Sequence, residues 1–257
     1  LFNQYVMIEL LKGDCLEVMK EIKSESIDAI ICDPPYGTTA CKWDSVIDFK
    51  LMWEQLNRII KLNGAIVLFG SEPFSSALRM SNIKNYKYDW IWNKSKPVGF
   101  ANAKKMPLKD IETISIFYKK PPTYNPQGLL KCSREINNST KTKKQNNITA
   151  INGGAFKTET YKQEFTNYPR QILRYGVEQG LHPTQKPIKL MEYLIKTYTN
   201  ENEIVLDFTM GSGSTGVGCI NTNRQFIGIE QDENYYNMSV NRIEDAKKER
   251  DKLTLFK

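Results

Sequence analysis

The feature that most constrains the fold is a glycine-rich loop set between a predicted strand and a predicted helix. The strand is the apolar segment 203–208, EIVLDF, and the helix begins within GSTGVGCINTN at 213–223. The next predicted strand, QFIGIE, ends on Glu230. This order is typical of a parallel α/β sheet, which binds nucleotide-like ligands at the carboxyl ends of its strands. The loop glycines follow the spacing G-x-G-x-x-G: Gly211, Gly213 and Gly216.

The rest of the chain continues this alternation in a permuted order. Only about 40 residues follow the loop, too few for the second half of a dinucleotide-binding sheet, so the missing strands must come from the N-terminal half. Apolar periodicity predicts a helix at 45–62, closed by Asn63-Gly64, with helices on both faces of a mostly parallel sheet. The other predicted helices lie at 16–23, 187–199 and 232–252, and the other predicted strands at 5–11, 27–32, 65–70, 88–93 and 112–119.

Asp207 helps to choose the ligand of the glycine loop. It ends the strand beside the loop, where the pyrophosphate of a dinucleotide would face its carboxylate at a cost in free energy. A ligand with an ammonium group and no phosphate suits the position better. S-adenosylmethionine has this make-up, with a ribose for Glu230, and NAD remains the alternative.

The segment IDAIICDPPYG, at 27–37, is a second strand that ends on a carboxylate. A surface turn is one interpretation. The other is an active-site element, because the carboxyl ends of parallel strands open into the same crevice. Asp33 and backbone carbonyls near Pro34 and Pro35 would accept hydrogen bonds from an exocyclic base amine. The prolines fix φ and remove competing donors, and Tyr36 offers a ring on which an extruded base can stack.

The charge distribution favours a polyanionic partner. The formal net charge is +7, and residues 120–170 are rich in Lys, Asn, Thr, Gly and Pro. A solvated loop is the alternative for this segment, and the same pair of interpretations applies to Lys94 and Lys96. The five cysteines form no CxxC pair, and no run of apolar residues is long enough to cross a membrane. These features favour a reducing, cytoplasmic location without a disulfide framework or a zinc site.

Five motifs together resemble the amino-methyltransferases of DNA, in the group whose catalytic motif precedes the methyl-donor motif. The motifs are DPPYG (33–37), HPTQKP (182–187), DFTMGSGSTG (207–216), FIGIEQDENYYNMSVNRI (226–243) and, more weakly, GDCLEVM (13–19). The resemblance covers about residues 8 to 245. One departure is Phe208, where the family usually has proline.

The resemblance implies an α/β fold: a Rossmann-like S-adenosylmethionine-dependent methyltransferase sheet with permuted motif order and an inserted target-recognition segment. The implied divisions are a catalytic part at 1–119, the insert at 120–175 and a donor-binding part at 176–257. No metal is implied. The catalytic residues carried over are Asp33, Pro34, Pro35 and Tyr36. The donor-binding residues are Asp14, Cys15, Asp33, Thr184, Gln185, Lys186, Asp207, Phe208, Gly211, Ser212, Gly213, Ser214, Thr215 and Glu230.

The expected reaction is methyl transfer from S-adenosylmethionine to N6 of an adenine flipped out of double-stranded DNA, because Asp at the first position of DPPY usually accompanies adenine. Cytosine N4 and a catalytically idle DNA-binding homologue are the alternatives. His182, the one histidine of the chain, is interpreted as part of the donor motif rather than as a base. A homodimer and a cognate restriction endonuclease are further expected partners.

Overall fold

The computed structural model describes residues 6–38, 44–136, 161–178 and 185–255. These residues form two compact units, Leu1–Asn125 with Gln171–Lys257, and Pro126–Arg170. The first unit holds an eight-stranded sheet, and the second holds a two-stranded one. No helix among the described residues is long and apolar enough to cross a membrane.

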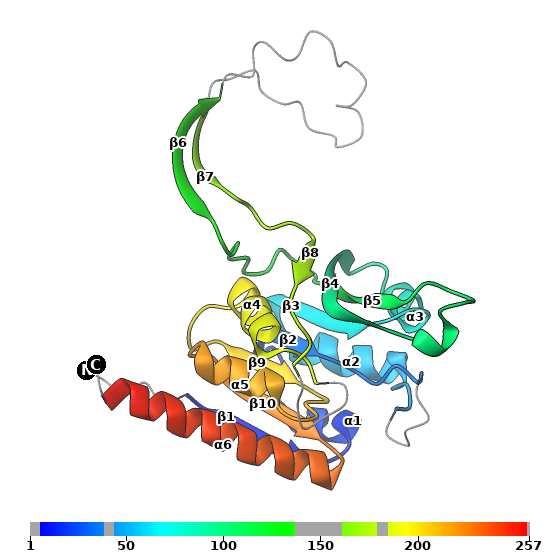
Figure 1. Ribbon diagram of the computed structural model, residues 1–257. Helices are drawn as coiled ribbons and strands as arrows, with labels where there is room; N and C mark the ends of the chain where they lie inside the picture. Colours follow the sequence, from blue (N-terminus) through cyan, green and yellow to red (C-terminus); the bar gives the residue numbers. More distant parts are fainter. Residues whose placement is uncertain (1–5, 39–43, 137–160, 179–184, 256–257) are drawn as a thin grey trace. The chain divides into compact units, whose positions relative to one another are not determined.

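The large sheet shows the permuted order directly. Its strands run β1 (Ile8–Lys12), β10 (Gln225–Glu230), β9 (Ile204–Asp207), β2 (Ile27–Cys32), β3 (Ile60–Gly70), β5 (Lys109–Phe117), β4 (Tyr86–Val98) and β8 (Ile172–Arg174). The five strands from β1 to β3 in this order are parallel, whereas β5 is antiparallel to both of its neighbours. Strand β2, which precedes DPPYG, therefore lies directly beside β9, which precedes the glycine loop (Figure 1).

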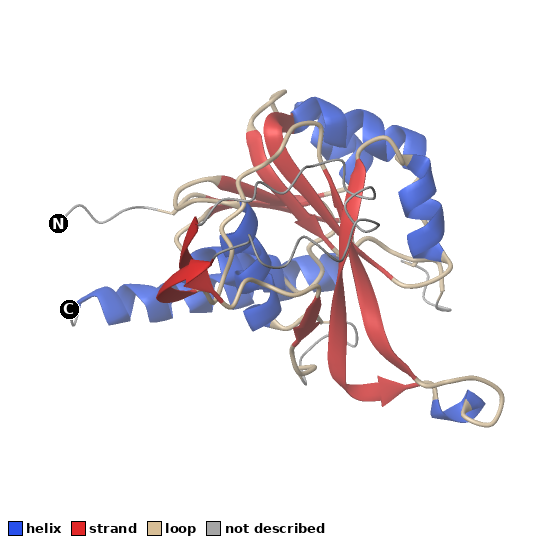
Figure 2. Cartoon of the chain, turned by 90° about the horizontal axis from the view of Figure 1, so that it is seen from above, coloured by secondary structure: helices blue, strands red, loops and turns tan. Residues whose placement is uncertain are grey.

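Helices cover both faces of the sheet because side chains alternate along its buried strands. Ala29 and Ile31 of β2 face α4 (Ile188–Tyr198), α5 (Ser214–Asn221) and α6 (Glu233–Leu255) in one apolar cluster. Ile30 and Cys32 face the other cluster, with α1 (Cys15–Val18), α2 (Phe49–Ile59) and α3 (Phe74–Ser81). Figure 2 shows the sheet passing between the helices. Short 3₁₀ helices follow α1 and β4: η1 (Met19–Glu21) and η2 (Phe100–Asn102).

The expected end of the helix at Asn63-Gly64 is wrong. Helix α2 ends at Ile59 and β3 starts at the next residue. Asn63-Gly64 lies inside β3, where the pairing with β2 jumps from Ile27–Ile60 to Ala29–Ala65. A Cβ at Gly64 would meet the carbonyl oxygen of Asp28 at 2.8 Å, so this irregular turn of the strand requires glycine.

The second unit is built on a hairpin. Strands β6 (Leu130–Ile136) and β7 (Tyr161–Thr166) pair in antiparallel fashion, and the residues between them lie outside the described part of the chain. The side chain of Asn167 closes the base of the hairpin by donating to the carbonyl of Gly128 at 2.7 Å. This unit falls within the insert expected at 120–175, and its role in target recognition stays a prediction.

Candidate active site

A cavity of about 290 Å³ lies at the carboxyl ends of the parallel strands. It brings together residues that follow β1, β2, β9 and β10, as the two strand-end motifs predicted. Most of the expected site residues line it: Asp14, Cys15, Asp33, Pro34, Pro35, Tyr36, Gln185, Lys186, Asp207, Phe208, Gly211, Ser212, Ser214, Thr215 and Glu230. Gly213 is not among them, since it packs against α6, and Thr184 and His182 lie outside the described residues.

We call the first part of the cavity wall the glycine-loop side, formed by Asp14, Asp207, Gly211 and Glu230. The Glu230 carboxylate accepts from the amides of Gly211 at 2.9 Å and Asp232 at 2.8 Å. Burial raises the pKa of Glu230, and these two amides oppose that rise. The backbone therefore holds this carboxylate at the rim of the cavity.

Asp207 shapes the glycine loop from within. Its Oδ2 accepts from the hydroxyl of Thr215 at 2.5 Å and its Oδ1 from the amide of Thr209 at 3.2 Å. Burial raises the pKa of Asp207 to about 6. Gly211 adopts a φ of +51° with open space around the position of a Cβ, so both its conformation and its lack of a side chain suit a closely bound ligand.

Asp14 and Cys15 border the same side at the start of α1. The Asp14 Oδ1 caps this helix by accepting from the amides of Leu16 at 2.8 Å and Glu17 at 3.3 Å. Burial raises the pKa of Cys15 to about 12, so its side chain is a neutral thiol at physiological pH. The amide of Gly13 donates to the carbonyl of Glu230 at 3.0 Å, which ties the end of β1 to the end of β10.

We call a second part of the wall the DPPY side, formed by Asp33, Tyr36, Lys186 and Glu112. The Tyr36 hydroxyl donates to Oδ1 of Asp33 at 2.5 Å, and the Lys186 ammonium donates to Oδ2. Burial raises the pKa of Asp33, the positive charge of Lys186 opposes this, and the negative charge of Glu112 adds to it. The hydroxyl of Thr209 also donates to the Asp33 carbonyl at 3.1 Å, which joins DPPY to the glycine loop.

Lys186 serves two carboxylates at once. Its nitrogen lies 3.3 Å from Oε2 of Glu112, whose other oxygen pairs with Lys94. Burial lowers the pKa of Lys186, but the two carboxylates outweigh this and raise it overall, so the side chain stays charged. Burial likewise raises the pKa of Glu112, and the two lysines outweigh it and lower the value. Together with Lys94, which lies behind Glu112, the two acids and Lys186 of the DPPY side form a charge-balanced cluster.

The ring of Tyr36 is positioned by α3, a helix that the sequence did not predict. Tyr36 packs against Phe74, the first residue of α3, with ring centroids 5.0 Å apart.

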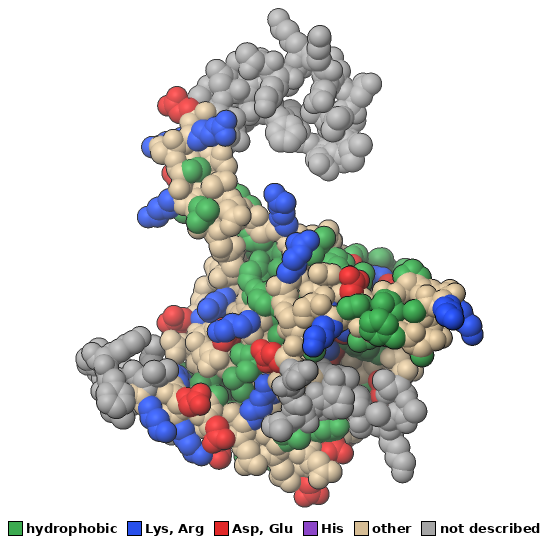
Figure 3. All heavy atoms as spheres, viewed as in Figure 1, with side chains coloured by type: hydrophobic (Ala, Val, Ile, Leu, Met, Phe, Trp, Pro, Cys, Tyr) green, Lys and Arg blue, Asp and Glu red, His purple; other side chains and the backbone are tan. Residues whose placement is uncertain are grey.

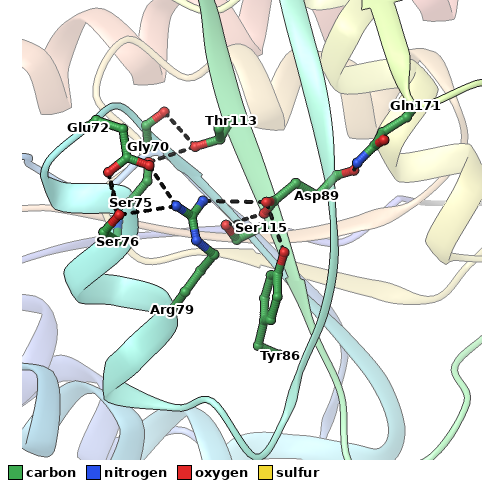
Figure 4. Close-up of polar contacts among 10 residues, drawn as sticks. All are labelled: Gly70, Glu72, Ser75, Ser76, Arg79, Tyr86, Asp89, Thr113, Ser115 and Gln171. Atoms are coloured by element: carbon green, nitrogen blue, oxygen red, sulfur yellow. Dashed lines mark hydrogen bonds and ion pairs between the residues drawn. The ribbon is translucent and has the colours of Figure 1, made fainter.

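Figure 4 shows how polar contacts fasten helix α3 to the sheet. Arg79 pairs with Glu72 at 2.6 Å and with Asp89 of β4 at 3.4 Å. The hydroxyls of Ser115 and Tyr86 donate to the Asp89 carboxylate at 2.6 and 2.9 Å. The hydroxyls of Ser75 and Thr113 share a hydrogen bond of 2.6 Å.

The sequence matches the model of a DNA methylase family, the N6/N4 type, over residues 27–241. The chain belongs to this family. The match covers DPPYG and the glycine loop, the two motifs that line the cavity. The predictions of a DNA amino-methyltransferase and of a Rossmann-like α/β fold are confirmed.

Named relatives match more than nine-tenths of this chain. Type II methyltransferase M.HinfI of Haemophilus influenzae is 28% identical, over 93% of this chain and 68% of the relative. DNA adenine methyltransferase YhdJ of Escherichia coli K12 is 29% identical, over 92% and 83%. The crystal structure of the M1.HpyAVI–SAM complex superposes with a TM-score of 0.62 at 29% identity, covering 92% of this chain and 99% of that one. The cytosine-N4-specific PvuII methyltransferase, at 16% identity and a TM-score of 0.62, shares the fold.

The structure of the methylase adds residues that sequence reasoning missed. Glu112 enters the cavity because β5 runs antiparallel to β3, which brings the beginning of β5 to the carboxyl edge of the parallel strands. Asp44 accepts from the amides of Gly37 at 2.8 Å and Thr38 at 2.9 Å and so holds the turn after DPPY. The sequence signal that could have indicated Glu112 is its place as an acid at the start of the apolar run ETISIF. Asp44 has no such local signal.

Proposed function

We propose that this methylase transfers a methyl group from S-adenosylmethionine to N6 of an adenine flipped out of double-stranded DNA. The observation that carries the proposal is that one cavity is bordered both by the DPPY acceptors and by the glycine loop. The name of YhdJ, a DNA adenine methyltransferase, and the SAM complex of M1.HpyAVI support the same donor and target. Bound at the glycine loop, S-adenosylmethionine supplies an electrophilic methyl group on a sulfonium.

The residues present fit this donor. Open space at Gly211 lets a ligand approach the backbone, and the fixed carboxylate of Glu230 is placed to accept hydrogen bonds from ribose hydroxyls. Asp14, at the end of β1, would contact the adenine of the donor. The neutral Cys15 and the apolar Phe208 also line this side of the cavity and add no further charge to it. We keep the other donor-binding residues inferred from the family as proposals: Thr184, Gln185, Lys186, Ser212, Gly213, Ser214 and Thr215.

Asp33 would activate the target amine. The lone pair of an exocyclic amine is delocalised into the base, so the nitrogen is a weak nucleophile. A carboxylate and a nearby backbone carbonyl that accept its two N–H groups favour a pyramidal nitrogen with its lone pair facing the methyl. Lys186 helps to keep Asp33 ionised for this task. Because burial raises its pKa, Asp33 is also a suitable acceptor for the proton that the methylated amine must release.

The test uses plasmid DNA grown without methylation, isotope-labelled S-adenosylmethionine and mass spectrometry of the digested nucleosides. We expect label in N6-methyldeoxyadenosine with the wild type. Label in N4-methyldeoxycytidine would overturn the choice of base, and donor binding without any label would indicate an idle homologue or another substrate.

The variant Asp33→Ala is expected to lower the rate about a thousand-fold, while calorimetry shows S-adenosylhomocysteine binding within a few-fold of the wild type. Asp48→Ala is a matched control, because Asp48 caps α2 and is not among the residues that line the cavity. An Asp33→Ala enzyme with near-normal turnover would contradict the assigned role.

The proposed function also suggests how the DNA site is recognised, which proteins accompany the enzyme and where it acts. We infer that Pro126–Arg170 reads the DNA site, because this unit occupies the place of the family's target-recognition segment. Relatives named Type II methyltransferases support a cognate restriction endonuclease. A DNA substrate favours the cytoplasm. A homodimer stays a prediction, which light scattering of the purified protein would check.

A further inference from the structure

We propose that residues 95–110, which comprise the end of β4, the turn that follows it and the start of β5, form an arm that docks on duplex DNA beside the extruded adenine. We call these residues the β4–β5 arm. The proposal rests on the DNA methylation proposed above, and it assigns a contact surface outside both the cavity and the second unit. Three features of the arm support it: its charge, its exposed apolar side chains and its origin at the DPPY side.

The arm is strongly basic. It carries four lysines, Lys96, Lys104, Lys105 and Lys109, against the single acid Asp110. All four lysines are exposed. Lys94, just before the arm, is different because it turns inward to pair with Glu112. The exposed lysines thus have no role in the cluster of the DPPY side, and they suit phosphate groups.

The tip of the arm also exposes large apolar side chains. Phe100 is 68% exposed, Met106 53% and Val98 50%. A hydrogen-bonded turn holds them there: the amide of Asn102 donates to the carbonyl of Gly99 at 2.9 Å, and the amide of Met106 to that of Asn102 at 3.0 Å. A large aromatic held in solvent by an ordered turn, with lysines around it, indicates a contact surface rather than a solvated loop. Figure 3 shows hydrophobic side chains and basic side chains, lysine or arginine, exposed on one face of the molecule.

The arm begins where the catalytic cluster ends. Trp92 of β4 pairs with Glu112 of β5, and the same two strands continue outward into the arm. Figure 2 shows these strands running out beyond the sheet to the loop that holds η2. At ~3.3 Å per residue, the tip lies roughly 20 Å beyond Glu112, a reach of about six phosphates along one strand of DNA. A duplex whose adenine occupies the cavity is therefore within reach of the tip.

Charge selects DNA over a second copy of the chain as the occupant. Two arms meeting face to face would bring lysines against lysines, which is unfavourable. A duplex offers phosphates for the lysines and, between the strands, base edges and sugars for Phe100 and Met106. The apolar tip would then support the duplex within about six phosphates of the position that the flipped base leaves.

The first experiment measures binding to a fluorescent duplex by anisotropy at several salt concentrations, with S-adenosylhomocysteine present. We expect the double variant Lys104→Ala/Lys105→Ala to reduce the slope of log K against log salt by about 2, since each phosphate contact contributes about 0.9. The control is Lys84→Ala/Lys87→Ala, because these exposed lysines lie at and just before the opposite end of β4. Equal slopes for the wild type and the arm variant would overturn the proposal.

The second experiment separates duplex contact from catalysis. We expect Phe100→Ala to lower kcat/KM on a duplex about ten-fold, because an aromatic contact with bases is lost. On a single strand with the same adenine, the value should stay within two-fold of the wild type. An equal loss of kcat/KM on the duplex and on the single strand would contradict the DNA assignment. So would a changed oligomeric state in light scattering with an unchanged kcat/KM on the duplex. If the wild type itself neither binds nor methylates DNA, the proposed function fails rather than the arm.

Discussion

Glu230 and Asp33, which lie on different sides of the cavity, are held by different means. On the glycine-loop side, Glu230 is held by two backbone amides. On the DPPY side, Asp33 is held by two side chains, the hydroxyl of Tyr36 and the ammonium of Lys186. Backbone amides carry no net charge and do not titrate. The hydroxyl of Tyr36 and the ammonium of Lys186 can titrate, and the ammonium carries a net charge. The arrangement around Asp33 therefore responds to pH and to single substitutions.

This contrast teaches which property each side controls. The glycine-loop side offers a rigid surface shaped by loop conformation, as expected for a site that binds one unchanging donor. The DPPY side sets the charge of the group that faces the reacting amine. We therefore expect substitutions on the glycine-loop side to change donor affinity, and substitutions on the DPPY side to change the rate and its pH dependence.

Among the variants that test this contrast between the two sides, Lys186→Met is expected to have the largest effect. Loss of the ammonium leaves two buried carboxylates without their shared partner, which raises the pKa of Asp33 further. Because the ionised form of Asp33 is the active one, the acid limb of the kcat profile should move to higher pH. At pH 7.5 we expect a fall in kcat of about a hundred-fold. If the acid limb of the kcat profile stayed at the wild-type pH, the proposed difference between the two sides would be wrong.

Glu230→Gln tests the other side at a smaller magnitude. The neutral amide keeps the shape of the side chain but weakens the hydrogen bonds to ribose hydroxyls. We expect the Kd for S-adenosylhomocysteine to rise about thirty-fold, measured by calorimetry. With saturating donor, kcat should change less than three-fold. A large fall in kcat with unchanged donor affinity would mean that the two sides are not separable.

Glu112→Gln sharpens the comparison because its expected shift has the opposite sign to that of Lys186→Met. The negative charge of Glu112 raises the pKa of Asp33. Its removal lowers that pKa and moves the acid limb to lower pH, with a kcat at pH 7.5 within about five-fold of the wild type. Full kcat profiles from pH 5 to 9 for both variants provide the measurement. Shifts in the same direction would show that the cluster does not act through Asp33.

Arg79→Ala should have the smallest effect on chemistry, since Arg79 acts on the position of α3. Loss of its contacts with Glu72 and Asp89 is expected to lower the free energy of unfolding by about 1 kcal/mol. Urea denaturation followed by circular dichroism measures this. A rise in KM for DNA with little change in kcat would accompany it, because the support of Tyr36 by Phe74 loosens. An unaltered midpoint would show that the network of Figure 4 does not hold the helix.

The same contrast explains what the sequence could predict. The glycine loop, Glu230 and DPPY are short contiguous patterns, and each sits at the end of an apolar strand. Their meeting at one cavity follows from the parallel order of β2 and β9. Glu112 could not be placed in this way, because its position depends on the direction of β5. The apolar pattern of a strand does not specify the direction in which it joins the sheet.

Errors in local structure had a similar cause. Asn63-Gly64 is a usual turn signal, but pairing with β2 continues past it and absorbs it into β3. The hairpin of β6 and β7 lies in a polar segment without the alternation that indicates a strand. Helix α3 is short and starts after Pro73, and its tie to the sheet comes from Arg79 and Asp89 rather than from a helical pattern.

The permuted sheet has a consequence for how the chain is made. Strand β2 is synthesised long before β9, the strand that pairs with one of its two edges, where Ala29 meets Val205. During translation that edge stays open while nearly all of the intervening chain emerges. A buried, apolar strand with an unpaired edge is prone to join other chains. We therefore expect the nascent methylase to be prone to aggregation until β9 has emerged and closes the centre of the sheet.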